Sequence, residues 1–426
     1  MYKSLNKKSQ NNLLPKSLLA SYCKNQARFK YTRYGNLCGV SNYVNLEILT
    51  GTDKLGKVEF SMYSEIIEQS QILKELAKKY LPLNSSVQNI HLNITKEELD
   101  NLSKVYIVAS GSSRNVGNIA KYLIENIARL HVDVDYSSEF AHRNPCLKNN
   151  DLVIAVSQSG ETADTYYALR EAVDKGAHTL ALTNCPESKI NNLAKSSMHV
   201  GAGKERGIAA TKSFTAQLIN LFALAVFLGE QRGTISEEEA EELKEELHSA
   251  LEKMDEFLEN TDNITKLAQK IKDVSNLVIV GRSLSYAVAQ EGALKIKETS
   301  YIDANGYPTG EFLHGYVAVL DNDIPVISII VPNKKHEANY KLAIKQTLEM
   351  QQKGNSRLII IKNSEDKAIE ERFSEDVQYI NIPSSCEEVS PFFTVVCLQL
   401  LALRIAEALG KDPDNPRGLT KAIVSE

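Results

Sequence analysis

The sequence has few cysteines and no pattern among them. Its 426 residues include six cysteines, with no Cys-x-x-Cys pair and no regular spacing: Cys23, Cys38, Cys146, Cys185, Cys386 and Cys397. A structural zinc site or a disulfide framework requires such spacing, so both are disfavoured, and the content fits a reducing compartment. We expect a cytoplasmic protein without a metal or a cofactor.

Long apolar runs and a strong excess of charge are also absent. No uninterrupted apolar run reaches the roughly 18 residues that span a bilayer. The longest, around Leu218 to Leu228, is broken by Asn220 and indicates a core helix. The net charge of −5 and the pI near 6.0 do not favour a nucleic-acid or membrane partner. The length allows two domains.

Acidic residues are missing from residues 1–46, which carry eight Lys or Arg; the first acid is Glu47. Such a segment is typical of a transit peptide. It equally fits a disordered tail or the remnant of a lost domain, and it lacks the apolar region of a secretory signal. We interpret residues 1–60 as a basic leader and expect it to be a disordered tail.

Strand and helix patterns alternate through the rest of the chain. Apolar runs such as Val105–Ala109 and Leu152–Val156 are each followed by helical spacing. This predicts the α/β class, with parallel sheets flanked by helices. We expect a first domain over residues 61–235, an acidic helical connector over 236–260 and a second domain over 261–426.

An internal repeat supports two copies of one domain. Val105-Tyr-Ile-Val matches Leu277-Val-Ile-Val, and 277 − 105 = 172. The same offset relates Asp151 to Asp323, since 323 − 151 = 172, and His142 to His314, since 314 − 142 = 172. Three coincident offsets without a gap predict a duplicated α/β domain.

The copies differ after the strand that ends at Val156. The first has Ser157-Gln-Ser-Gly-Glu-Thr162 at the start of a helix, and the second has Ile329-Ile-Val-Pro-Asn333. Free backbone N–H groups and the helix dipole favour an anion at the first turn. The hydroxyls could instead serve only as an ordinary N-cap. Only the first copy therefore offers a phosphate-like site.

Charged residues of the second copy share one helical face. Glu291, Lys295 and Glu298 are spaced i, i+4 and i+7. Such a series is usually a solvated surface ladder, but the surrounding apolar residues and His314 soon after favour a site. The Pro- and Gly-rich tail, residues 412–421, should be exposed, so Lys421 would by default face solvent.

Six motifs occur in the order found in one enzyme family. They are Gly111-Ser-Ser113, Ser157–Asp164, Ala209–Thr215, Glu291–Glu298, Gly310–His314 and Asn415–Lys421. From about residue 60 to 426 the chain resembles the isomerase half of the glucosamine-6-phosphate synthases, or glutamine–fructose-6-phosphate aminotransferases (isomerizing). The resemblance implies two tandem sugar-isomerase (SIS) domains, each flavodoxin-like, and a homodimer with a shared active site.

The resemblance also implies a role for each matching residue. The sugar phosphate would be bound by Ser113, Ser157, Gln158, Ser159 and Thr162, with Ile208, Ala210 and Glu291 also at the substrate. Glu298 would move a proton between C1 and C2, and Lys295 would line the same catalytic site. His314, from the neighbouring subunit, would open the ring. Lys421 would form a Schiff base with the ketose.

Four departures qualify the resemblance. The glutaminase half is missing from this sequence, so the chain alone is not expected to hydrolyse glutamine. Ala210 stands where the synthases usually have serine, and Leu313 stands where they usually have lysine before the histidine. Both changes could retune the choice of sugar phosphate. The basic leader matches nothing in the family.

Three functions therefore stay open. The first is amination and isomerisation of fructose 6-phosphate to glucosamine 6-phosphate, with free ammonia or ammonia from a separate glutaminase subunit. The second is the reverse, a glucosamine-6-phosphate deaminase of the SIS type. The third is a non-catalytic protein that binds sugar phosphates. Joint retention of Glu298, His314 and Lys421 argues against the third, and the tail is closer to the synthases than to the deaminases.

Overall fold

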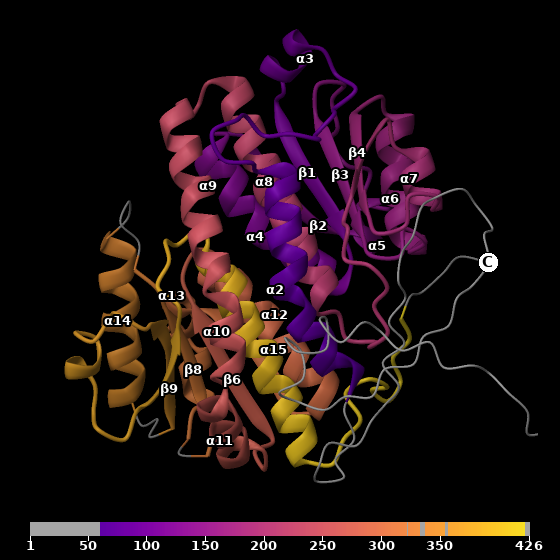
Figure 1. The fold of residues 1–426 in the computed structure, drawn as a ribbon. Coiled ribbons are helices and arrows are strands. Elements are labelled where there is room, and N and C mark those ends of the chain that lie inside the picture. Colours follow the sequence, from indigo (N-terminus) through magenta and orange to yellow (C-terminus); the bar gives the residue numbers. More distant parts are fainter. Residues whose placement is uncertain (1–59, 322, 333–336, 354–356, 422–426) are drawn as a thin grey trace, which may run out of the picture. The chain divides into compact units, whose positions relative to one another are not determined.

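A computed structural model describes residues 60–421 of the chain, apart from residues 322, 333–336 and 354–356. Residues 1–59 of the predicted basic leader thus lie outside the described residues. The described part contains two sheets of five strands each, and all paired strands are parallel (Figure 1). The predicted α/β class is confirmed.

The first sheet has the strand order β2-β1-β3-β4-β5. Its strands are β1 (Lys104–Ala109), β2 (His131–Tyr136), β3 (Leu152–Ser157), β4 (His178–Thr183) and β5 (Ser196–His199). Every residue of β3 and β4 is buried, as expected for strands in the middle of a parallel sheet. The connecting helices are α4 (Gly111–Ile127), α5 (Ser137–Phe140), α6 (Ala163–Asp174) and α7 (Lys189–Leu193).

The second sheet has the order β10-β9-β8-β6-β7. Its strands are β6 (Asn276–Gly281), β7 (Asp303–Pro308), β8 (Val326–Ile330), β9 (Leu358–Asn363) and β10 (Gln378–Ile382). The connecting elements are α12 (Leu284–Ser300), α13 (Thr309–Phe312), η1 (Tyr316–Val319), α14 (Glu337–Gln352) and η2 (Glu370–Arg372). Read from its other edge, this sheet repeats the topology of the first, so the predicted duplication is confirmed.

The offset of 172 residues holds through the first elements of each copy and becomes 173 at β3 and β8, where Ile154 pairs with Ile107 and Ile327 pairs with Ile279 (327 − 154 = 173). The offset of 172 relates the starts of β1 and β6 (276 − 104 = 172), of β2 and β7 (303 − 131 = 172) and of α5 and α13 (309 − 137 = 172). The copies also meet at equivalent positions, because the Asn118 amide donates to Gln290 Oε1 at 2.9 Å and 290 − 118 = 172. This contact lies where α4 packs on α12. A contact between equivalent positions is typical of two-fold related partners.

The remaining helices cover and join the two sheets. They are α2 (Ser61–Tyr80), α3 (Lys96–Asp100), α8 (Lys212–Arg232), α9 (Glu237–Glu252), α10 (Met254–Glu259), α11 (Asp262–Ile271) and α15 (Ser390–Ala408). The acidic stretch begins with a capping box, which Ser236 and Glu239 form. It is not wholly solvated: α9 buries one face, which includes Ala240 and Leu247.

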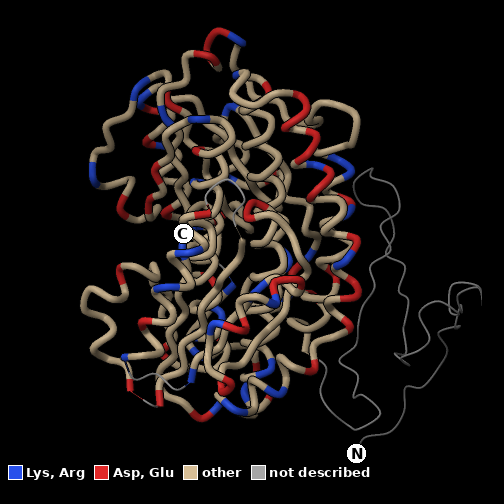
Figure 2. Tube along the Cα trace, turned by 90° about the vertical axis from the view of Figure 1, so that its left-hand side faces the viewer, with Lys and Arg blue, Asp and Glu red and all other residues tan. Residues whose placement is uncertain are grey.

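Two helices, α8 and α15, are long and apolar enough to cross a membrane by length and composition. Most of each is buried inside the fold, so both serve as core helices. Phe222 of α8 packs edge-on against Phe392 of α15, with ring centroids 6.3 Å apart. Acidic and basic residues are interspersed over the described part of the chain (Figure 2), in keeping with its small net charge of −5.

Candidate active site

The turn after β3 is built by its own hydroxyls. Ser157 Oγ accepts a hydrogen bond from the Gly160 N–H at 3.0 Å and lies 3.0 Å from Thr162 Oγ1. Ser159 Oγ accepts from the Glu161 N–H at 3.1 Å. Gly160 has φ +68°, and an added Cβ would lie 2.0 Å from Ser188 Oγ, so only glycine fits. The N-cap of α6, Thr162, makes no side-chain cap bond, so the hydroxyls are not an ordinary N-cap.

The turn after β1 lies beside it. In the parallel pairing of β1 with β3, Ala109 is opposite Val156, so the start of α4 adjoins the Ser157–Thr162 turn. The strand order reverses between these two strands, and such a switch point is where open α/β sheets bind ligands. Ser113 and Gln158 are both half-buried here. Five predicted phosphate-binding residues therefore come from two adjoining turns.

A buried ion-pair cluster lies on α12 of the second copy. Lys295 Nζ is 2.5 Å from Glu298 Oε2 and 3.6 Å from Glu291 Oε1. The side chains of Lys295 and Glu291 are each 1% exposed, and that of Glu298 is 20% exposed. The alternative of a solvated ladder is therefore wrong. Burial opposes the charge on Lys295, but the Glu298 and Glu291 carboxylates outweigh it and raise the lysine pKa.

Glu291 is held by the first copy. Asn115 on α4 donates from its amide to Glu291 Oε2 at 2.8 Å. Burial raises the pKa of Glu291 to about 7, although Lys295 and Asn115 both act to lower it. Glu291 Oε1 accepts no hydrogen bond from the described residues. The cluster of the second copy thus depends on the first helix of the first copy.

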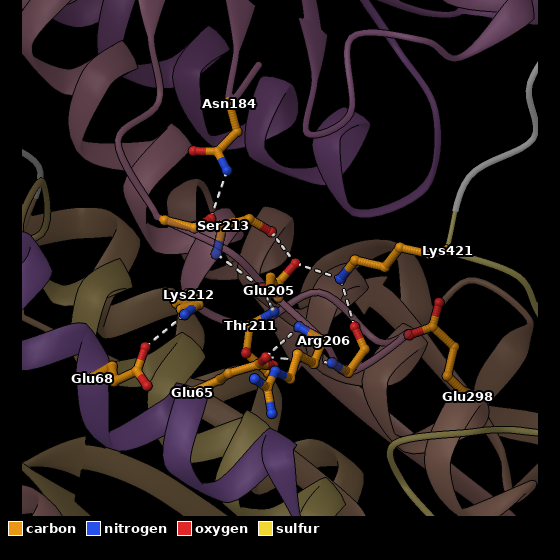
Figure 3. Close-up of polar contacts among 12 residues, drawn as sticks. Glu65, Glu68, Asn184, Glu205, Arg206, Thr211, Lys212, Ser213, Glu298 and Lys421 are labelled. Carbon is orange, nitrogen blue, oxygen red and sulfur yellow. Dashed lines mark hydrogen bonds and ion pairs between the residues drawn. The ribbon is translucent and has the colours of Figure 1, made fainter. Parts of the chain in front are cut away.

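The C-terminal tail brings Lys421 to the first copy. Its Nζ donates to Glu205 Oε2 at 2.7 Å and to the Gly207 carbonyl at 2.5 Å (Figure 3). Lys421 is therefore partly buried and paired, against the default expectation of a solvent-facing lysine. Burial disfavours the charge on Glu205, but Lys421 and backbone N–H donors outweigh burial, so the Glu205 pKa is lowered. The charge of Glu205 also contributes to the raised pKa of Lys295, after the larger effects of Glu298 and Glu291.

The loop between β5 and α8 carries the predicted sugar contacts. Ile208 and Ala210 lie half-buried in this loop, and the Ile208 N–H donates to the Asp414 carbonyl of the tail at 3.1 Å. Glu65 on α2 accepts from the N–H groups of Arg206 and Gly207. Burial raises the Glu65 pKa to about 7, assisted by the charge of Glu205.

His314 stands apart from these groups. It follows α13, where its N–H donates to the Glu311 carbonyl at 2.9 Å, and it is exposed. Its side chain makes no hydrogen bond or ion pair with another described residue. Within one described chain, His314 is therefore not joined to Lys421 or Glu298, and a shared site stays a prediction.

Three residues of the site were not predicted from the sequence: Glu65, Asn115 and Glu205. Glu205 lies four residues before the Ala209–Thr215 motif, in a glycine-containing loop, and nothing in the sequence pairs it with a lysine 216 residues away. Glu65 lies on a helix that reads as amphipathic, where an acid is expected to face solvent. Only the fold brings these carboxylates together.

Comparison with known families identifies the fold. A family model described as the SIS domain matches residues 98–227 and 270–406, so the chain belongs to the SIS domain family. The glutamine–fructose-6-phosphate aminotransferase (isomerizing) of Chlorobaculum tepidum is 41% identical over 374 residues, 87% of this chain and 59% of that protein. Its counterpart in Clostridium tetani is 36% identical over the same length and 60% of that protein. The chain thus spans about three fifths of these relatives, and the predicted resemblance is confirmed.

Solved structures agree with this placement. The C-terminal domain of glucosamine-fructose-6-phosphate aminotransferase from Francisella tularensis superposes with a TM-score of 0.78 at 28% identity. The match covers 84% of this chain and 98% of that one. A glucosamine-6-phosphate deaminase from Thermotoga maritima matches with a TM-score of 0.64 over 86% of this chain and all of that one. At 23% identity, this second likeness shows the fold alone.

Proposed function

We propose that the chain aminates fructose 6-phosphate and isomerises it to glucosamine 6-phosphate in amino-sugar biosynthesis, with ammonia as the nitrogen donor. One observation carries the proposal. Lys421 of the tail pairs with the buried Glu205 of the first copy, and Glu298 of the second copy pairs with the buried Lys295. The fold thus holds an imine-forming lysine and a proton-transferring carboxylate, each beside a buried partner of opposite charge. The name and 41% identity of the Chlorobaculum tepidum relative support the same reaction.

In this proposal the first copy holds the phosphate. The ligands are the switch-point residues Ser113, Ser157, Gln158, Ser159 and Thr162. Hydroxyls, an amide and the first N–H groups of α4 and α6 suit a phosphate dianion. A fixed phosphate keeps the reacting carbons in register with groups on the other copy. Ile208 and Ala210 would line the sugar, and Ala210 leaves that wall without a hydroxyl.

The second copy and the tail supply the chemistry. His314 of a neighbouring subunit would open the ring, because imidazole can take and give a proton near neutral pH. Lys421 would form an imine at C2, which acidifies the adjacent C–H bond. Glu298 would carry the proton between C2 and C1. Lys295 and Glu291 would hold Glu298 in place.

The setting follows from this assignment. The protein would be a cytoplasmic homodimer, because a histidine shared between subunits requires a second copy. Ammonia would come from solution or from a separate glutaminase subunit. The boundary between the two SIS domains would lie in the acidic helices of residues 236–260.

A direct assay tests the proposal. The purified chain is incubated with fructose 6-phosphate and either ammonium or glutamine, and hexosamine phosphate is detected. We expect product with ammonium. Release of fructose 6-phosphate from glucosamine 6-phosphate, without the forward reaction, would establish a deaminase instead. Inactivity in both directions, with sugar phosphate still bound, would leave a binding protein.

Subunit mixing tests the shared histidine. A His314→Ala chain and a Lys421→Ala chain are each expected to be inactive alone. In a mixed dimer, one of the two sites keeps both residues, so mixing should restore part of the activity. Absence of rescue after subunit exchange has been demonstrated by differently tagged chains would count against a site built from two subunits.

A further inference from the structure

Glu205 occupies an unusual place for a carboxylate with no predicted role. Its side chain is fully buried, and it meets the amine of a lysine 216 residues further along the chain. We propose that Glu205 positions the Lys421 amine for attack on the sugar carbonyl. This inference rests on the proposed function, in which Lys421 is the nucleophile.

The carboxylate is fixed before the lysine arrives. One oxygen, Oε1, accepts from the N–H groups of Thr211 and Ser213 at 2.9 and 3.1 Å. The other, Oε2, accepts from Ser213 Oγ at 2.7 Å and from Lys421 Nζ. Three donors of its own loop and helix therefore hold the Glu205 carboxylate rigidly. A lysine has a flexible four-carbon stem, so the rigid partner sets where the amine lies.

Positioning of the amine is separable from attachment of the tail. The tail also binds this region through Asp414, whose Oδ1 accepts from the Met62 N–H at 2.8 Å. Further along, the Arg417 N–H donates to the Tyr301 hydroxyl at 3.0 Å. These contacts do not involve Glu205. Loss of the Glu205 charge should leave the tail attached while the lysine end loses its fixed acceptor.

The charge also suits the reaction. The Lys421 ammonium gives up a proton, and the amine lone pair forms the C–N bond to the C2 carbonyl. The carbinolamine hydroxyl takes up a proton and leaves as water, so ammonium and ketone yield a protonated imine and one water without an oxidant or reductant. Nitrogen is cationic before and after the step, and an adjacent anion stabilises both states.

Borohydride trapping tests this inference. Native chain with fructose 6-phosphate is reduced with borohydride, and the sugar adduct on Lys421 is followed by mass spectrometry. We expect Glu205→Gln to slow trapping about 100-fold, the cost of a misplaced reacting group. Affinity for glucitol 6-phosphate, which has the phosphate but no carbonyl, should stay within about twofold. The turnover number should fall in parallel with trapping while KM is unchanged.

A nearby carboxylate provides the control. Glu68, on α2, pairs with Lys212 at 2.6 Å but does not contact Lys421, so Glu68→Gln should trap at the native rate. Native-rate trapping by Glu205→Gln would overturn the inference. An absence of adduct in the native chain would instead overturn the proposed function and the inference with it.

A second variant covers the case in which Glu205→Gln does not fold. Ser213→Ala removes one donor to Oε2 and leaves the charge, so it should slow trapping about tenfold, a smaller misplacement than loss of the carboxylate. Trapping by Ser213→Ala within twofold of native would then overturn the inference.

Discussion

The two copies differ most on the helix that follows their first strand. On α4 of the first copy, Ile119 and Leu123 are fully buried apolar residues. The equivalent positions on α12, at 291 − 119 = 172 and 295 − 123 = 172, are Glu291 and Lys295, which are equally buried. Apolar residues fill this position without a desolvation cost, whereas a buried ion pair often contributes nothing net to stability. The charges of the second copy are therefore best explained by chemistry.

The segments that follow β3 and β8 differ in the opposite sense, because here the first copy carries the polar residues. Gly160 has φ +68°, whereas the segment that follows β8 contains Pro332, which is locked near φ −65° and cannot adopt that turn. Ile107 pairs with Ile154 and Ile279 pairs with Ile327, so β3 and β8 correspond at an offset of 327 − 154 = 173, and Ile330 takes the place of Ser157. The first copy has a hydroxyl-rich turn and an apolar helix, and the second has an apolar turn and a charged helix. In the proposed function, the duplicated fold would thus divide binding and proton transfer between its halves.

The largest effect should come from Lys421→Ala. This change removes the amine of the C-terminal tail, a group that lies outside the repeated elements of both copies. Turnover should fall at least about 1,000-fold, the scale seen when a nucleophile is removed, while sugar-phosphate binding remains measurable by calorimetry. Lys411→Ala, at the residue just before the tail, is the matched control and should keep native turnover. Appreciable turnover by the Lys421→Ala chain would remove the Schiff-base role.

Giving the second copy the residues of the first tests the division of labour. Glu291→Ile with Lys295→Leu should keep or raise the free energy of unfolding, by up to about 4 kcal/mol, because a buried pair is replaced by apolar groups. Turnover should still fall at least about 100-fold, the contribution of a positioned acid–base group. Lys295→Leu alone should lower the free energy of unfolding by about 3 kcal/mol. Urea titration measures the free energy of unfolding of each variant, and an activity assay measures its turnover. An active double variant would contradict the assignment.

Glu65 and Glu291, from different parts of the fold, both have pKa values raised to about 7, chiefly by burial. For Glu65 the folded value exceeds the ordinary 4.5, so its stabilisation is complete below pH 4.5 and is lost as pH rises through 7. Glu65→Gln should remove this loss of stability. The gain in its free energy of unfolding over the native chain should be larger at pH 8 than at pH 4, by up to about 3 kcal/mol. Urea titrations at pH 4 and pH 8 measure this difference in the free energy of unfolding. Glu68→Gln, at an exposed residue, is the control. An equal effect at both pH values would show that Glu65 ionises normally.

The smallest effect concerns the turn. Ser159→Ala should weaken sugar-phosphate binding by about 1–3 kcal/mol, because it removes a hydrogen bond to a charged group. Val331→Ala changes a residue in the segment that directly follows β8 of the second copy, and should leave affinity unchanged. Titration with glucitol 6-phosphate compares the two. Unchanged affinity in Ser159→Ala would place the phosphate elsewhere.

Local sequence patterns predicted most of the fold. Apolar runs predicted β1, β3 and β6, and the offset of 172 between the first elements predicted the duplication. Strand β7 has no such pattern: it contains Gly306, and it also contains Pro308, which an edge strand such as β7 tolerates. An added Cβ at Gly306 would lie 2.8 Å from the Ala289 carbonyl oxygen, so α12 requires the glycine there.

The site was less predictable than the fold. The serine turn followed from its strand-to-helix context, and the resemblance supplied Glu298 and Lys421. The sequence could not tell whether Lys295 is solvated or buried, because the spacing i, i+4 is the same in both cases. Asn115 contacts Glu291 and Glu205 contacts Lys421, and both of these partners lie more than 170 positions away. Such partners are fixed by tertiary packing alone.

The contact between Asn118 and Gln290 has a consequence for how the asymmetry arose. In a dimer of identical chains, a substitution at a contact on the two-fold axis changes both partners at once, so like must meet like. Here the equivalent positions belong to one chain, and a shorter amide donates to a longer one at 2.9 Å. Joining the copies frees each partner to change independently of the other, which is the condition under which two identical halves can become complementary.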